Sequence, residues 1–101
     1  MATANYDKEL NKLDNSYIEV AISFGQKFSI SPYIGKPLSY KFFREVRIRE
    51  KRLYFLVYDN IKIVLLIGIT DKKDQQEFIN KTKNELDEYR KLAEETSKQL
   101  F

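Results

Sequence analysis

The fold is decided by residues 44–73, which read REVRIREKRLYFLVYDNIKIVLLIGITDKK. Near the start of this stretch, Val46 and Ile48 alternate with charged residues, which is the two-residue period of a strand with one face in solvent. Two runs of apolar, β-branched and aromatic residues follow, over positions 53–58 and 61–69. The breaks between the three segments are short, and short connections join antiparallel neighbours. We therefore expect a three-stranded antiparallel meander, whose apolar face the rest of the chain must cover.

Helical patterns precede the meander. Apolar residues at helical spacing predict a short helix over about residues 5–13. Ser16 and Glu19 fit a capping box that opens a second helix over about residues 17–28, and Pro32 ends it. The two helices are expected to form an αα-hairpin that packs on the sheet. We expect the second helix to bury Ile18, Ala21, Ile22, Gly25 and Phe28.

A loop and a long helix complete the predicted architecture. Residues 33–38 contain Gly35 and Pro37 and are expected to turn the chain from the helices into the sheet. After the meander, Asp74 and Glu77 form a second capping pair. An apolar seam with steps of three and four then predicts one long helix, whose first half packs on the sheet and whose second half projects, frays or docks on a partner. The seam comprises Ile79, Thr82, Leu86, Tyr89, Ala93, Thr96 and Leu100.

The composition bounds the chemistry of this α+β protein, which we expect to form a single domain over residues 1–101. The chain has no cysteine and no histidine, which removes disulfides, thiolate metal sites, the usual general base and every Ser-His or Cys-His pair. We therefore expect no metal and no cofactor, and any catalysis must use arginine, lysine, tyrosine and carboxylates. Neither a secretory signal nor a membrane span is visible, so we expect a cytoplasmic protein with no membrane partner.

Positive charge is concentrated in the predicted sheet. Positions 36–73 carry ten lysines and arginines against four acidic residues, although the net charge of the whole chain is only +3. Such a cluster favours an anionic partner, either nucleic acid or an acidic protein segment. The alternative is a solvated strand face on which cations prevent edge-to-edge pairing.

The meander is expected to bring several of these cations to one rim. The end of its first strand, the start of its second and the end of its third lie at the same end of an up-down-up sheet. Guanidinium and ammonium groups gathered there would bind phosphate and stabilise negative charge that develops on a phosphorane. The alternative is a rim that only keeps the sheet soluble. The residues concerned are Arg49, Lys51, Arg52, Lys72 and Lys73.

The order of these motifs resembles the RelE/ParE superfamily of type II toxin–antitoxin toxins, over roughly residues 7–90. The segments that carry the resemblance are GKPL at 35–38, EVRI at 45–48, YFLVY at 54–58 and IGITDKK at 67–73. The resemblance implies a small antiparallel sheet packed by an N-terminal helical hairpin. For a RelE-like member it implies a metal-free endoribonuclease that cuts mRNA in the ribosomal A site by bringing the ribose 2′-oxygen onto the adjacent phosphate. The ParE branch instead blocks DNA gyrase.

The resemblance also implies partners and residues. The partners are a cognate acidic antitoxin, the ribosome and mRNA, and the seam of the last helix adds a weak homodimer as a further option. The chemistry also needs a base for the 2′-hydroxyl, for which Lys72 and Tyr58 are the only nearby candidates in the sequence. The positions matched to catalytic cations are Arg47, Arg49, Arg52, Lys72 and Lys73. The charge and aromatic patterns add nucleic-acid contacts from Lys36, Arg44, Lys51, Tyr33 and Tyr58.

Two aromatic residues depart from the pattern of many active ribonucleases in the superfamily. Phe55 stands where an arginine is expected in the second meander strand, and Phe78 lies nearest to the place of an expected tyrosine. The usual N-terminal strand is also absent or reduced to a few residues. These departures keep two alternatives open. One is a non-catalytic protein of this fold that acts on gyrase or only binds its antitoxin, and the other is a small basic single-stranded nucleic-acid binder.

Overall fold

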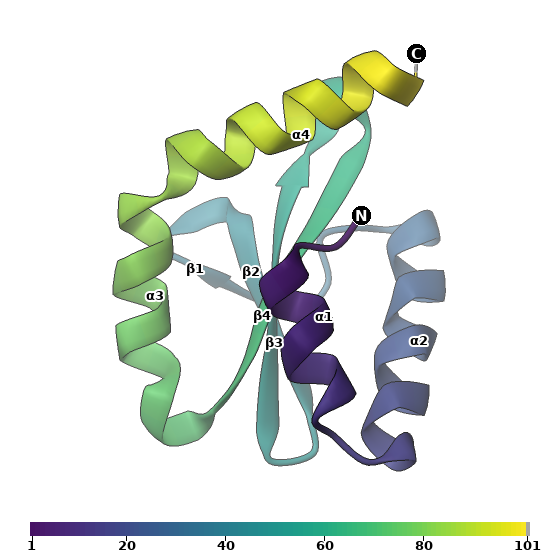
Figure 1. The fold of residues 1–101 in the computed structure, drawn as a ribbon, viewed down its shortest axis with the longest axis vertical. Coiled ribbons are helices and arrows are strands. Elements are labelled where there is room, and N and C mark those ends of the chain that lie inside the picture. The colour runs from purple at the N-terminus through teal and green to yellow at the C-terminus, as the bar shows by residue number, and fades with distance from the viewer. Residues whose placement is uncertain (101) are drawn as a thin grey trace.

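The computed structural model describes residues 1–100, in which four α-helices surround a four-stranded antiparallel sheet (Figure 1). The helices are α1 (Ala4–Asn11), α2 (Asn15–Ile30), α3 (Gln75–Asn84) and α4 (Leu86–Leu100). The strands are β1 (Lys36–Leu38), β2 (Tyr40–Ile48), β3 (Lys51–Tyr58) and β4 (Ile63–Asp71), and they lie side by side in chain order. Short 3₁₀ turns at Asp59–Ile61 and Lys72–Asp74 precede β4 and α3.

The predicted meander is confirmed as β2, β3 and β4. Val46 of β2 lies opposite Leu53 of β3, and Leu53 lies opposite Ile69 of β4. The connection between β2 and β3 is a two-residue turn, in which Arg49 adopts a left-handed backbone with a φ of 57°. Two-residue turns with positive φ match the natural twist of antiparallel strands. The observed turn comprises residues 49 and 50 and is one residue shorter than the predicted break at residues 50–52.

The sheet has one strand more than the sequence predicts. Residues 36–38 were expected to be a loop, yet Lys36 pairs opposite Glu45 and Pro37 opposite Arg44. The pattern conceals this strand because it is only three residues long and contains a proline, which an edge strand tolerates. Gly35 precedes the strand at a φ of 77°, where a Cβ atom would lie 2.0 Å from the carbonyl oxygen of Glu45. Glycine therefore permits this close approach of the chain to β2.

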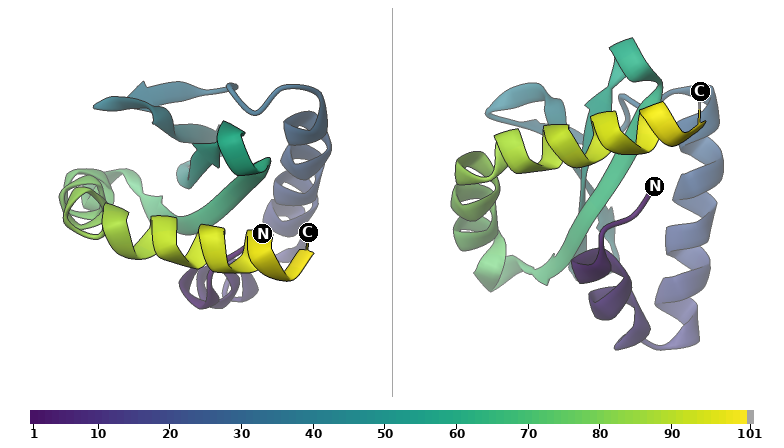
Figure 2. Two further views of the ribbon diagram at one scale, coloured as in Figure 1. Left: turned by 90° about the horizontal axis from the view of Figure 1, so that it is seen from above. Right: turned by 45° about the horizontal axis from the view of Figure 1, so that its top comes forward.

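Both faces of the sheet are buried, whereas one apolar face was expected. Helices α1 and α2 cover one face, and α3 and α4 cover the other (Figure 2). Strands buried on both sides read as continuous apolar runs, which explains why β3 and β4 lack a polar alternation. On the α1/α2 face the buried core comprises Tyr6, Tyr17, Ala21, Val46, Ile48, Leu53, Phe55, Val57 and Ile69. On the α3/α4 face it comprises Leu38, Phe43, Tyr54, Leu56, Leu65, Ile67 and Ile79.

The predicted helical hairpin is present, with two corrections. Asp14 caps α2 by accepting a hydrogen bond from the backbone N–H of Ser16, so the predicted capping box at Ser16 is wrong. Ile22 is 61% exposed, and nothing lies within 4 Å of a Cβ placed on Gly25. Ala21 and Phe28 pack against the sheet as predicted, and Tyr17 and Phe24 join them on the face that contacts it.

The predicted single C-terminal helix is wrong, because the chain bends at Glu85 between α3 and α4. Asp74 makes no side-chain capping bond at the start of α3. After the bend, α4 runs across one end of the sheet (Figures 1 and 2) and buries Ala93 completely. The second half of the seam therefore docks on its own domain, although Leu100 stays exposed.

The N-terminus covers the outer edge of β4. Ala2 forms a parallel bridge with Leu66, whose N–H donates to the Met1 carbonyl oxygen at 2.9 Å. The Thr3 N–H donates in turn to the Leu66 carbonyl oxygen at 3.0 Å. Apart from this single bridge, the described residues before α1 form no strand. Across residues 1–100, every helix is too short or too polar to cross a bilayer.

Candidate functional site

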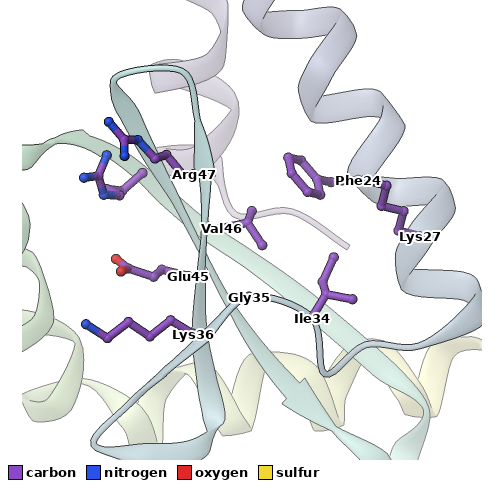
Figure 3. Close-up of a pocket in the computed structure, with 9 residues that line it drawn as sticks. Phe24, Lys27, Ile34, Gly35, Lys36, Glu45, Val46 and Arg47 are labelled. Atoms are coloured by element: carbon purple, nitrogen blue, oxygen red, sulfur yellow. The ribbon is translucent and has the colours of Figure 1, made fainter.

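A pocket of about 580 Å³ lies at the outer edge of β2 (Figure 3). Pairing between β1 and β2 stops at Lys36 and Glu45, after which the chain before β1 turns away towards α2. The last residues of β2, positions 46–48, therefore have no strand on their outer side. The pocket lies beside this unpaired part of β2. Its lining residues are Phe24, Lys27, Ile34, Gly35, Lys36, Glu45, Val46, Arg47 and Arg52.

The pocket has one polar wall and one apolar wall, because successive residues of a strand point to opposite faces. Lys36, Glu45 and Arg47 project to one side of β2 in Figure 3, whereas Val46 and Phe24 lie on the other side. The chain therefore places charge and apolar surface next to each other across one strand edge.

The register of the sheet builds the polar wall. Lys36 lies opposite Glu45 across β1 and β2, and Arg47 lies opposite Arg52 across β2 and β3. Opposite residues of an antiparallel pair share a face, so these four side chains belong to one surface, which we call the hairpin site. The hairpin site comprises Lys36, Glu45, Arg47 and Arg52.

The three cations of the hairpin site make no ion pair with any residue in the described part of the chain. The Arg47 Nε donates to the Arg49 carbonyl oxygen at 2.9 Å, and Arg52 makes long bonds of 3.4 and 3.5 Å to backbone oxygens of the turn. Like charges directly opposite each other destabilise a sheet. Arg47 and Arg52 thus form an uncompensated positive pair that an anion would stabilise.

Glu45 is the acidic member of the hairpin site and is 7% exposed. The Gln75 side-chain amide, at the start of α3, donates a hydrogen bond to its carboxylate. Nearby, the hydroxyl groups of Tyr54 and Thr70 lie 2.8 Å apart. Burial raises the pKa of Tyr54, and the negative charge of Glu45 raises it further. Glu45 was not among the predicted site residues, although the two-residue period of the strand places it on the same face as Arg47.

The five cations lie at one end of the sheet, as predicted, because Lys51 lies opposite Asp71 and Lys72 follows it, but they do not gather in one cluster. Arg52 joins Arg47, but the Arg49 guanidinium lies over the Tyr17 ring at 5.4 Å, on the α2 side of the sheet. Lys51 forms an ion pair with Asp71, which lies opposite it on β4. The alternation of the strand explains Lys51, because it sends the pair Arg47–Arg52 and the neighbouring pair Ile48–Lys51 to opposite faces. Arg49 does not follow this alternation, because it lies beyond β2, in the turn, with a φ of 57°.

Lys72 and Lys73 follow β4 in the turn that leads into α3, and both are exposed. Neither of them lines the pocket. Lys51 lowers the pKa of Asp71 through its hydrogen bond and its charge, and Lys73 contributes a smaller share. The two lysines therefore remain candidates for contacts to the flanking parts of a long anionic ligand, while the pocket itself depends on the hairpin site.

Arg44 has a structural position and not the exposed one expected of a nucleic-acid contact. It is buried and donates to the carbonyl oxygens of Ile34, Lys41 and Gly35 at 2.9 to 3.0 Å. Its guanidinium also lies over the Tyr33 ring, at 5.6 Å. The Tyr33 hydroxyl donates to Asp59, and this bond raises the Tyr33 pKa. Arg44 thus holds the segment before β1 against β2 and positions Ile34 and Gly35, which line the pocket.

Tyr58 does not lie at the pocket. It is at the opposite end of β3 from the turn, and its hydroxyl is buried without a hydrogen-bond partner in the described residues. Burial raises the pKa of Tyr58 to about 12. At neutral pH its phenolate fraction is therefore on the order of 10⁻⁵, so Tyr58 is unsuited to deprotonate a 2′-hydroxyl.

Phe55 belongs to the core, and Phe78 packs against it while partly buried. Phe55 is fully buried, and its ring centroid lies 4.6 Å from that of Phe28. Phe78 stacks on Tyr54 with a centroid separation of 4.4 Å. Gly68 makes this stack feasible, because a Cβ there would lie 2.5 Å from the Phe78 ring. Neither aromatic residue can replace a missing cationic or phenolic group.

Comparisons of the chain with protein families, with characterised proteins and with solved structures gave no match. Among the described residues, no group of three or more acidic side chains is placed to hold a metal ion.

Proposed function

We propose that the protein is a RelE-like toxin of a type II toxin–antitoxin module that cleaves mRNA bound to the ribosome. One observation carries the proposal. Lys36, Arg47 and Arg52 line one open pocket, and none of them makes an ion pair within residues 1–100. An unneutralised cation cluster beside an open pocket suits a phosphodiester.

The chemistry that this arrangement supports is 2′-O transphosphorylation. Attack of the ribose 2′-oxygen on the adjacent phosphorus places additional negative charge on the non-bridging oxygens. Arg47 and Arg52 lie opposite each other on one face of the sheet, and their guanidinium groups would stabilise that charge as it develops. The products would be a 2′,3′-cyclic phosphate and a free 5′-hydroxyl.

The apolar wall of the pocket supports RNA as the ligand. Phe24, Ile34 and Val46 supply apolar surface beside the cations, against which an unstacked base can pack. A volume of about 580 Å³ lies in the range of ordinary small-molecule pockets. The pocket thus offers a phosphate and its neighbouring base separate surfaces.

The proposed partners follow from the same charge distribution. A positive sheet edge suits the ribosome with its mRNA, and it equally suits a cognate acidic antitoxin that covers the site when the toxin is silent. A short acidic reading frame next to the gene of this protein would support the pairing.

The decisive experiment is cleavage of a defined mRNA on programmed ribosomes by the purified protein. We expect cleavage that leaves a 2′,3′-cyclic phosphate, and we expect Arg47→Ala to abolish it while folding is retained, because Arg47 is exposed. Lys83→Ala removes an exposed lysine of α3 outside the pocket and is the matched control. Absence of cleavage by the unmodified protein, together with normal growth on expression, would refute the ribonuclease proposal.

A second candidate function is supported by the full burial of Phe55 and by the packing of the partly buried Phe78 against the core. With the expected arginine and tyrosine replaced by core residues, the same fold would act as a non-catalytic binding protein, directed at gyrase or only at its antitoxin. This candidate predicts growth arrest without RNA cleavage, and inhibition of gyrase supercoiling separates its two forms. A protein that only binds single-stranded nucleic acid would instead need no ribosome and would lose affinity steeply with salt.

A further inference from the structure

Glu45 is a carboxylate in a pocket wall otherwise built from cations. The cluster proposed from the sequence has groups that hold a phosphate, but its two candidates for the base are unsuitable or remote: Tyr58 lies at the far end of β3, and Lys72 lies outside the pocket. Transphosphorylation needs a group that accepts the 2′-hydroxyl proton. Glu45 is the acidic side chain among the residues that line this pocket.

The surroundings of Glu45 position its carboxylate for that role. The Gln75 amide donates to Oε2, which fixes the rotation of the group and leaves Oε1 without a hydrogen bond to any described residue. Arg47 follows two residues later on the same face, and Arg52 lies opposite Arg47. No carboxylate–cation distance in the site is short enough for an ion pair, so the Glu45 carboxylate is not tied to a neighbouring cation.

We propose that Glu45 is the general base of the hairpin site, a catalytic role that rests on the ribonuclease function proposed above. Its Oε1 takes the proton from the ribose 2′-hydroxyl as the 2′-oxygen bonds to phosphorus. The bond from phosphorus to the 5′-oxygen then breaks, and that oxygen takes a proton from the Lys36 ammonium, which lies opposite Glu45. Arg47 and Arg52 hold the non-bridging oxygens throughout, and exchange with solvent returns Glu45 and Lys36 to their starting states.

A purely structural role for Glu45 makes a different prediction. In that case the carboxylate would serve to hold Gln75 and the start of α3 near β2. The substitution Glu45→Gln separates the two roles, because the glutamine carbonyl oxygen still accepts from the Gln75 amide while the basic carboxylate is lost. Stability should therefore change little, whereas proton transfer should fail.

The test is single-turnover cleavage of mRNA on programmed ribosomes by the full chain and by Glu45→Gln. We expect the cleavage rate to fall at least about 100-fold, within the usual contribution of a general base. Affinity for the same complex carrying a 2′-deoxynucleotide at the cleavage position, which cannot react, should stay within about threefold. Glu50→Gln is the matched control, because it also removes one negative charge, from the turn after β2. Glu50 does not line the pocket and accepts a hydrogen bond from the Tyr17 hydroxyl.

A sulfur leaving group distinguishes the base from the acid. In a substrate with a 5′-bridging sulfur the leaving group needs no proton, so the Glu45→Gln defect should persist. Restoration of cleavage with this substrate would overturn the assignment and make Glu45 the acid. Cleavage by Glu45→Gln within about threefold of the unmodified rate, while Arg47→Ala remains inactive, would also overturn it and leave the ribonuclease proposal standing. Absence of cleavage by the unmodified protein would remove both proposals.

Discussion

Arg44 allows the sharpest prediction about how the pocket is built. Its three donor groups reach the carbonyl oxygens of Ile34, Gly35 and Lys41, at 2.9, 3.0 and 3.0 Å. The bonds to Ile34 and Gly35 fasten the segment before β1 to the edge of β2, where the pocket opens, and the bond to Lys41 lies within β2. Arg44→Lys keeps the positive charge and most of the aliphatic stem, but an ammonium cannot reproduce the planar fork that serves three acceptors at once.

The size of the effect can be worked from those contacts. A hydrogen bond to a charged group is worth about 1.5–3 kcal/mol, and the lysine is expected to keep one of the three. Gly35 and Lys41 lie at the surface, so their released carbonyl oxygens can bind water and part of the loss is recovered. We therefore expect Arg44→Lys to lower the free energy of unfolding by about 2–4 kcal/mol, a large fraction of the total of about 5–15 kcal/mol for an ordinary domain.

Urea unfolding followed by far-ultraviolet circular dichroism measures this change. Arg47→Lys is the matched control, since Arg47 lies three residues further along β2 and is exposed, and it should change stability by less than about 0.5 kcal/mol. Amide hydrogen exchange should also accelerate in β1, which the Arg44 bonds hold in place. If Arg44→Lys unfolds at the same urea concentration as Arg47→Lys, the argument that these bonds build the pocket is wrong.

Three further predictions concern the core and its charges. Leu65→Ala should cost about 2–5 kcal/mol in chemical denaturation, because Leu65 is fully buried, whereas Leu92→Ala on the surface of α4 should cost under about 1 kcal/mol; equal losses would contradict the assigned core. Burial raises the pKa of Tyr6 to about 12, because the folded state favours the protonated hydroxyl. The stabilisation of the folded state that results is complete below the ordinary tyrosine pKa of 10.0 and is lost as the pH rises from there to about 12. The loss amounts to about 3 kcal/mol, and Tyr6→Phe should lack this part of the alkaline destabilisation when unfolding is followed by circular dichroism; an unchanged alkaline profile would count against burial of the hydroxyl. Lys51 lowers the pKa of Asp71, so Lys51→Met should raise that pKa towards its ordinary value in a carbon-detected NMR titration, and no shift would show that the ion pair is absent in solution.

The order of the three long strands was predictable because it depends on local features. Apolar runs of strand length separated by short breaks leave antiparallel neighbours as the simplest arrangement, and β2, β3 and β4 adopt it. The helical hairpin was predictable for the same reason, from spacing and from a turn near Asp14. Strand β1 was not, because three residues with a proline look like a loop until β2 lies beside them.

The C-terminal helices show where a periodic pattern misleads. The seam continues through Glu85 without a proline or glycine, so a straight helix was the natural prediction. The chain bends there because Ile79 and Thr82 pack on the sheet face, while Ala93 is buried only if α4 turns across the sheet end. The gain from burial outweighs the loss of continuous helical hydrogen bonds.

The site was half predictable. Lys36, Arg47 and Arg52 could be named from the concentration of positive charge in the sheet. The strand period also put Glu45 on the face of Arg47. The separation of Arg49, Lys51 and Arg44 from Arg47 and Arg52 depends on contacts with Tyr17, Asp71 and the backbone before β1, which lie far away in the sequence. Phe24 comes from α2 and could be placed in the pocket only once the helix was docked.

The amino-acid sequence by itself determined the three long strands, the helical hairpin and the excess of positive charge, because periodicity, turn length and composition act over neighbouring residues. The tertiary structure alone decided that the sheet is covered on both faces, that the last helix is divided at Glu85, and that Lys36, Glu45, Arg47 and Arg52 share one pocket. These outcomes depend on register and on packing between distant segments, where a shift of one residue moves a side chain to the opposite face.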